Sequence, residues 1–371
     1  MSALLGATTS FPVHYALAQD GTTKSAGDPL FTSAHGEITV TAPKPRVITI
    51  PDVGNYKVLK GDFHMHTLFS DGVVMPKVRV QEAIENGLDC IAITDHIEVR
   101  PNLGGNSIKL AENNDDHSIA YNIAKPEADK GNLILIRGTE ITKKTMPPGH
   151  FNAIFIKDAN AIAAVVDDWK KMLAVAADQG GFVFWNHPGW VAPNSGGLAT
   201  GVPMSFTDEH EDVRKKGHLH GVEVFNGTSH FPIVSDWCNE RNLGLVTVSD
   251  IHSTEYQMYG VQNLRRPMTL ILAEDRTESA IREAFFAHRT IGWAADMIFG
   301  KPEWVEKLFR SSVEIEKSTN GLTLRNISDI PCLVGSSELA SKGTLEIATA
   351  QKLTVNNWFV GTNKPLEIAV Q

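Results

Sequence analysis

Short apolar runs alternate with segments of helical periodicity between residues 56 and 292. The runs are rich in β-branched and aromatic side chains, which is typical of buried strands. They predict seven strands, at residues 61–63, 90–94, 133–136, 151–156, 181–185, 222–225 and 245–248. Strands that alternate with helices indicate a mainly parallel α/β fold.

Three segments between these strands carry apolar side chains at helical spacing. The first helix is predicted at residues 76–87, where Pro76 is suited to begin a helix and Gly87 to end it. The second is predicted at residues 163–177 and the third at residues 233–241. After the seventh strand, a further strand at 268–272 and a helix at 280–288 predict the closure of a barrel.

Two connections depart from this alternation. Only nine residues separate Glu140 from His150, and they include Pro147 and Pro148, so no crossover helix fits between them. The fourth strand is therefore expected to run antiparallel to the third. The second connection, residues 188–218, is Gly-rich with little periodicity, and we interpret it as a lid beside a functional site.

The pattern changes beyond residue 296, where short runs of alternating polarity predict a small all-β appendage. These runs lie at residues 322–324, 345–348, 352–355 and 366–370. The chain is thus expected to have an N-terminal arm (1–55), an α/β domain (56–295) and a β-rich C-terminal domain (296–371). The last of these is a candidate surface for homodimer formation.

Charge and composition narrow the class of protein. The formal net charge of −9 disfavours binding to long nucleic acid or anionic membranes, although a small anionic substrate remains compatible with it. No apolar run approaches the roughly 20 residues that span a bilayer. Cys90, Cys238 and Cys332 form no CxxC pair and are expected to be buried free thiols.

The N-terminal segment has part of the pattern of a signal peptide, which gives evidence on the cellular compartment of the protein. The tripeptide Ala16-Leu17-Ala18 precedes a polar stretch, as at a signal-peptidase site, but the segment lacks a basic start and a clean apolar centre. A periplasmic or secreted location is slightly favoured over a cytoplasmic one.

Metal-binding side chains recur beside the predicted strands. His64 and His66 are two residues apart, so both imidazoles point to one face of an extended chain. Seven further candidate ligands are Asp71, His96, Glu140, His150, His187, Asp250 and His252. Active sites of α/β barrels lie at the carboxyl ends of the strands, where such residues converge. Imidazole and carboxylate together suit zinc, manganese or iron rather than calcium.

Several other polar residues are candidates for a supporting role. Arg100, Lys143 and Lys144 follow ligand-bearing strands and are candidates to bind phosphate oxygens, although surface charge explains them equally well. Residues that could orient a ligand histidine are Glu223, Asn226 and Asn186. The remaining histidines are expected to be structural, with three of them as candidate neighbours of the site: His218, His220 and His230.

In their order along the chain, these motifs resemble the PHP family, the polymerase and histidinol phosphatase superfamily of metal-dependent phosphoesterases. The matching motifs are His64-x-His66, Ser70-Asp71-Gly72, Thr94-Asp95-His96, Gly138-Thr139-Glu140, His150, Asn186-His187-Pro188 and Asp250-x-His252. The resemblance covers about residues 57–292 and implies a distorted seven-stranded (β/α) barrel that holds two or three divalent ions.

The resemblance also implies how the ligands divide among the ions. One ion would be held by His64, His66, Glu140 and Asp250. A second would be held by Glu140, His150 and His187, and a third by Asp71, His96 and His252. It implies a hydrolase that cleaves a small phosphomonoester or phosphodiester with a metal-bridging hydroxide, with His96, Asp250 and His252 as catalytic residues.

Two other interpretations stay open at this point. An amidohydrolase-like metal hydrolase also begins with His-x-His and ends with an Asp, and a metal-stabilised binding module would use the β tail to recognise a partner. The seven-strand count, the Asp250-x-His252 pair and the Asp71 and His96 pair favour the phosphoesterase, because the resemblance implies that these pairs serve a third metal.

Overall fold

The computed structural model describes residues 29–32, 39–41, 45–99, 102–103, 106–107, 115–142, 148–189, 204–319 and 321–370. The chain divides into two compact units, residues 1–45 and 46–371. Within the first unit, β1 (Pro29–Thr32) and β2 (Thr39–Thr41) form an antiparallel pair. All features discussed below belong to the second unit.

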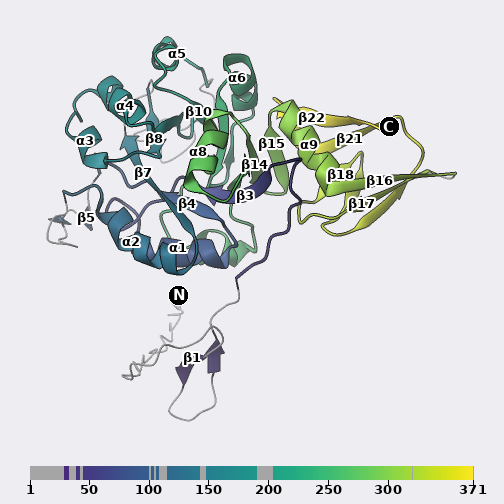
Figure 1. The fold of residues 1–371 in the computed structure, drawn as a ribbon, viewed down its shortest axis with the longest axis horizontal. Helices are drawn as coiled ribbons and strands as arrows, with labels where there is room; N and C mark the ends of the chain where they lie inside the picture. The colour runs from purple at the N-terminus through teal and green to yellow at the C-terminus, as the bar shows by residue number, and fades with distance from the viewer. Residues whose placement is uncertain are drawn as a thin grey trace, which may run out of the picture. The chain divides into compact units, whose positions relative to one another are not determined.

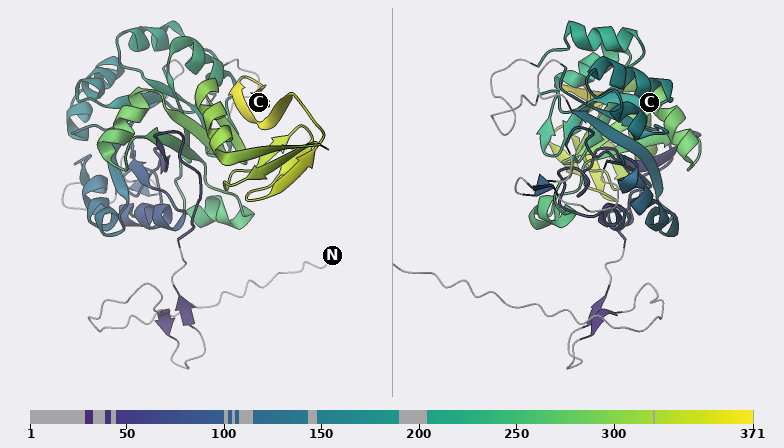
Figure 2. Two further views of the ribbon diagram at one scale, coloured as in Figure 1. Left: turned by 45° about the vertical axis from the view of Figure 1, so that its right-hand side comes forward. Right: turned by 90° about the vertical axis from the view of Figure 1, so that its left-hand side faces the viewer.

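The second unit is a mixed α/β structure around one large sheet, with helices around the outside (Figures 1 and 2). All seven predicted strands are present, and each pairs with the next one along the chain. They are β3 (Lys57–Asp62), β4 (Cys90–Ile93), β7 (Ile134–Thr142), β8 (His150–Ile154), β9 (Phe182–Trp185), β10 (Gly221–Asn226) and β12 (Gly244–Val248). Neighbouring strands run parallel except at β8, which is antiparallel to β7 and β9. The predicted reversal of the fourth strand is confirmed.

The expected closed barrel is not formed by the described residues. Beyond β3, the sheet continues through β13 (Met268–Ala273), β14 (Thr290–Ala294) and β15 (Met297–Gly300), all antiparallel to their neighbours in this series. The other end, β12, approaches β13 and β14 through threonine hydroxyls: Thr269 donates to the Thr247 carbonyl (2.8 Å) and Thr290 to the Leu245 carbonyl (2.7 Å). The sheet therefore curls until β12 lies beside β13 and β14, but side chains take the place of a backbone ladder between them.

Four helices occupy predicted positions: α1 (Pro76–Glu85), α4 (Trp169–Asp178), α6 (Ile233–Arg241) and α8 (Glu278–Phe286). The helix predicted at 163–177 is instead two, because Asp168 caps a new helix, α4, after α3 (Ala159–Ala163) ends. Elements not predicted include α2 (Ile119–Lys130), α5 (Asp208–Lys215), α7 (Glu255–Met258), η1 (Gly260–Gln262), α9 (Pro302–Ser312), β5 (Asn102–Leu103), β6 (Asn106–Ser107) and β11 (Ser229–His230).

The chain after α9 is built of strands, at the right of Figure 1. An antiparallel sheet contains β16 (Val313–Ser318), β17 (Gly321–Asn326) and β20 (Thr344–Ile347). The others are β18 (Cys332–Val334), β19 (Ser337–Leu339), β21 (Lys352–Gly361) and β22 (Lys364–Ala369). Because β21 pairs with β15, this second group extends the large sheet rather than forming a separate one. The domain boundary near residue 296 stays a prediction.

Burial agrees with the expected role of the cysteines. Cys90, Cys238 and Cys332 are buried free thiols, as predicted. Phe285 of α8 packs edge-on against Phe63 and Phe182, with ring centroids 4.8 and 5.1 Å apart, so the backbone directly before His64 is anchored in the core. Among the described helices, none has the length and apolar character needed to cross a membrane.

Candidate metal centre

The nine candidate ligands lie together beside the central strands. Ligand atoms within 4.8 Å of one another form three overlapping groups: His64, His66 and Glu140; Glu140, His150 and His187; and His66, Asp71, His96 and His252. Asp250 joins the first group, because its Oδ1 lies 3.1 Å from Nε2 of both His64 and His66. These groups match the division implied by the resemblance, except that His66 also faces the third.

His64 and His66 lie just beyond β3 rather than within a strand. Between them, Met65 forms a parallel bridge with Ile251, and the His66 N–H donates to the Ile251 carbonyl (3.0 Å). The extended backbone still directs both imidazoles to one side. The bridge also joins the His-x-His segment to the Asp-x-His segment after β12, which brings Asp250 beside the two histidines.

Glu140 and His150 lie on two neighbouring strands that run antiparallel, an arrangement that a series of parallel strands would not provide. Glu140 lies inside β7, and His150 is the first residue of β8, opposite Thr142 in the register of the pair. Because β8 runs antiparallel, its beginning lies at the same edge as the carboxyl ends of its neighbours. His150 begins the strand predicted at 151–156, and Glu140 lies inside β7 because that strand runs beyond the predicted residues 133–136.

The Glu140 carboxylate lies between the first and second groups. Its Oε2 is 2.9 Å from Nε2 of His64 and 3.2 Å from Nε2 of His66, whereas its Oε1 is 2.7 Å from Nδ1 of His150. Glu140 is almost completely buried. Each oxygen thus faces a different group, which is the arrangement needed for one carboxylate to bridge two ions.

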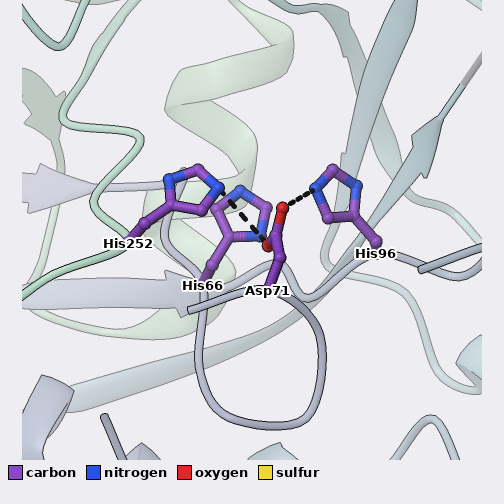
Figure 3. Close-up of side chains that lie close together, drawn as sticks. All are labelled: His66, Asp71, His96 and His252. Atoms are coloured by element: carbon purple, nitrogen blue, oxygen red, sulfur yellow. Dashed lines mark ion pairs between the residues drawn. The ribbon is translucent and has the colours of Figure 1, made fainter. Parts of the chain in front are cut away.

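The third group surrounds Asp71 (Figure 3). Its Oδ2 lies 3.2 Å from His96 Nε2, and its Oδ1 lies 3.3 Å from His252 Nε2. The His66 ring stacks on His252 and His96, with centroids 4.2 and 4.5 Å apart. The Asp71 and His252 side chains are 38% and 41% exposed, so this group opens to solvent while the first is buried.

Three ligand imidazoles use their second nitrogen to bind the protein. His64 Nδ1 lies 2.6 Å from Glu223 Oε1, His252 Nδ1 donates to the Asp250 carbonyl (2.8 Å), and His96 Nδ1 bonds to Thr142 Oγ1. This fixes the rings and leaves Nε2 facing the cluster, as is usual for metal-binding histidines. The donor set and its orientation therefore fit divalent ions.

Glu223 also organises its surroundings. It accepts hydrogen bonds from the His187 N–H (2.6 Å) and from Asn226 Nδ2 (2.8 Å), and Asn226 also donates to Asp250 (3.2 Å). Asn186, in contrast, pairs with Asn152 of β8 instead of a ligand histidine. Of the three supporting residues suggested by the sequence, two contact the candidate ligands.

Burial and charge determine the ionisation of the cluster. Burial opposes the charge of His66, but the hydrogen bonds that its ring donates to Asp250 and Glu140 raise its pKa to about 10. Burial likewise opposes the charge of His64, but Asp250, Glu223 and Glu140 raise its pKa well above the usual value. Burial acts to raise the pKa values of Glu140 and Asp250, but His96 and His64 hold the pKa of Glu140 well below normal, and His64 and His66 do the same for Asp250. The carboxylates thus favour the protonated form of His64 and His66, and a metal ion that binds here would displace those protons.

Polar side chains that were not predicted as site residues support the ligand-bearing segments. Asp62 accepts hydrogen bonds from the N–H groups of His64 (3.3 Å) and Ser249 (3.1 Å), and the fully buried Arg266 donates to Asp62 (2.7 Å). Asp95 accepts from the Thr67 N–H (2.7 Å) in the loop before Asp71. Apart from the Asp62 contact with His64, these partners are distant in sequence, so no local pattern would have identified them.

Other predicted neighbours of the site are placed elsewhere or not described. Arg100, Lys143 and Lys144 lie outside the described residues, as do residues 190–203 of the proposed lid, whereas residues 208–215 of that segment form α5. His220 accepts from the Val183 N–H (3.0 Å) and packs on Phe182. His230 packs on Phe299, and His218 belongs to none of the three groups.

Comparison with known proteins gives an extensive match to a solved structure. A model of the PHP domain matches residues 62–182. A two-domain protein from Bacteroides vulgatus, containing a predicted PHP-like metal-dependent phosphoesterase, is 32% identical; the alignment covers 89% of this chain and 99% of that one, with a TM-score of 0.78.

Two further structures are less similar. A candidate metal-dependent phosphoesterase from Bifidobacterium adolescentis is 18% identical, covering 52% of this chain and 88% of that one (TM-score 0.37). An amidohydrolase from Chromobacterium violaceum with bound sulfate and no metal is 12% identical, covering 53% and 89% (TM-score 0.37). No curated protein matches the chain.

Proposed function

The chain belongs to the PHP family, and we propose that it hydrolyses a small phosphomonoester or phosphodiester with two or three divalent ions of manganese, zinc or iron. The Glu140 carboxylate carries this proposal, because its two oxygens face different groups of ligands. A single structural metal would not require such an arrangement. A shared carboxylate keeps two ions close enough to act on one phosphoryl group.

The charge of the centre supports a phosphorylated substrate. Three divalent ions would bring a formal charge of about +6, and the ligand carboxylates of Asp71, Glu140 and Asp250 bring −3. The resulting excess of positive charge would attract a phosphate even though the whole chain carries −9. When bound, such ions lower the pKa of a coordinated water and neutralise phosphoryl oxygens.

The side chains would divide the remaining work. Asp250 lies against both His64 and His66 and holds them in place for the buried group. His96 and His252 lie on either side of Asp71 in the more exposed group. We assign this group to the departing oxygen of the ester, where the positive charge of an ion held by Asp71, His96 and His252 would stabilise the alkoxide.

The proposal is tested with p-nitrophenyl phosphate and bis-p-nitrophenyl phosphate as paired substrates. Protein purified without a histidine tag is assayed as isolated, after treatment with chelator, and after addition of Mn²⁺. We expect release of p-nitrophenol from at least one substrate, its loss with chelator and its return with metal. Chelator-insensitive release, or no release from either substrate, would contradict the proposal.

A further inference from the structure

Helix α1 contains a buried arginine that contacts the candidate metal centre through the backbone. Arg79 is fully buried. Its guanidinium donates to three carbonyls: His66 O from Nε (2.9 Å), Ile251 O from Nη2 (3.1 Å) and Ser253 O from Nη1 (2.8 Å). Nη1 also pairs with Glu82 (2.7 Å). One side chain therefore holds two segments that lie about 180 residues apart in the sequence.

These carbonyls flank ligands of the third group. Residues 251 and 253 stand on either side of His252, and the third carbonyl belongs to His66 itself. The backbone between the same segments is joined by His66 N–H to Ile251 O (3.0 Å) and by Val73 N–H to His252 O (2.8 Å). Arg79 is thus placed to fix the separation of His66 and His252, whose rings stack at 4.2 Å.

The third group depends on the hydrogen bonds of Arg79 more than the buried groups do. Asp71 and His252 are more than one-third exposed, so core packing does not fix their side chains. The first group has separate support from Asp62 and Arg266, which act at His64 and Ser249. Loss of Arg79 should therefore affect the two groups unequally.

We propose that Arg79 is a positioning residue that builds the third metal site by holding the backbone at His66 and on both sides of His252. Arg79 contacts no ligand atom of the cluster and acts only through these carbonyls. The inference rests on the proposed metal centre, and it adds that occupancy of the third site is controlled from the buried face of α1.

The test measures metal binding by the full chain rather than activity. Chelator-treated protein is titrated with Mn²⁺ by calorimetry, and bound metal is counted by elemental analysis. Arg79→Met is compared with His252→Ala, which removes a third-group ligand. The matched control is Arg289→Met, because Arg289 is also buried, donates to a carbonyl (Leu272 O, 3.0 Å) and pairs with a glutamate, Glu283, outside the cluster.

We expect Arg79→Met to weaken the weakest class of sites roughly 10- to 100-fold, as other changes outside the ligand shell do. Its isotherm should resemble that of His252→Ala, with the tighter sites retained, whereas Arg289→Met should bind like the unsubstituted protein. Melting temperatures should fall for both arginine variants, which separates a general loss of stability from loss of one site.

A second variant covers the case in which Arg79→Met does not fold. Arg79→Lys keeps the charge but cannot donate to three carbonyls at once, so it should weaken the same class of sites. Unchanged metal binding in folded Arg79→Lys or Arg79→Met would overturn the inference about Arg79 and leave the proposed function standing. Unchanged stoichiometry in His252→Ala would also overturn it, because the third group would then hold no ion. Failure of the unsubstituted chain to bind metal would overturn the proposed function as well.

Discussion

Protonation of His210 should destabilise the protein in mild acid by an amount that the structure allows us to calculate. The ring is fully buried and stacks on Trp185 with centroids 3.8 Å apart. Its Nε2 donates to the Pro148 carbonyl (2.8 Å), and its Nδ1 accepts from the Thr207 N–H (3.3 Å) at the start of α5. Protonation would turn Nδ1 into a donor and break the bond to the Thr207 amide.

Burial lowers the pKa of His210 from 6.5 to about 4, more than its bond to Pro148 raises it. The unfolded chain therefore takes up this proton first as the pH falls. The stabilising contribution is fully present above pH 6.5 and is lost between about pH 6.5 and 4. Each unit of pKa difference between the folded and unfolded chain corresponds to about 1.4 kcal/mol, so protonation lowers the free energy of unfolding by roughly 3 kcal/mol by pH 4.

His210→Phe removes the titration but keeps an aromatic ring against Trp185. Urea unfolding of both chains, with chelator present throughout, is followed by circular dichroism from pH 8 to pH 4. At pH 8 the variant should be less stable by about 1–3 kcal/mol, because two buried groups lose their partner. The two chains have all other titrating groups in common. The difference between their free energies of unfolding should therefore shift by roughly 3 kcal/mol in favour of the variant by pH 4. A difference that is constant over this range would refute the reasoning.

Three further predictions concern the metal centre. His96→Ala should reduce turnover far more than the free energy of unfolding, and steady-state kinetics alongside urea unfolding would show this; full activity would reject its catalytic role. Glu223→Gln should weaken metal binding roughly 10- to 100-fold in calorimetry, because His64 loses a charged partner for Nδ1; unchanged affinity would contradict this. Gly72→Ala should lower both third-site occupancy and melting temperature, since an added Cβ would lie 2.6 Å from the His66 carbonyl group; a variant that retains both would show that the loop can shift freely.

Much of the fold was predictable because the strands bury β-branched and aromatic side chains over continuous runs. The polar helix α5 was not, since only His210 and Val213 are buried along it and no apolar stripe forms. Helix α2 carries an internal proline, Pro126, which normally argues against a helix. The open sheet was also beyond prediction, because hydroxyls of Thr269 and Thr290 replace a backbone ladder at the junction.

For the site, local motifs identified ligands but not what holds them. His64 and His66 could be found because their spacing has a direct geometric meaning. Arg79 could not, because an arginine on a helix is normally solvent-exposed, and its buried contacts depend on the meeting of residues 66, 251 and 253. The position of His150 at the start of a strand, by contrast, follows from the antiparallel direction of β8, which the short connection after Glu140 predicted.

The central claim, that Glu140 joins two metal ions that act together in hydrolysis, is tested most directly by a metal titration of activity. Metal-depleted protein is titrated with Mn²⁺ while bound metal and p-nitrophenol release are measured in the same samples. We expect no hydrolysis without metal, activity that rises only as a second ion binds, and no comparable rise for Glu140→Gln. Full activity with a single bound ion, or in metal-loaded Glu140→Gln, would contradict the claim.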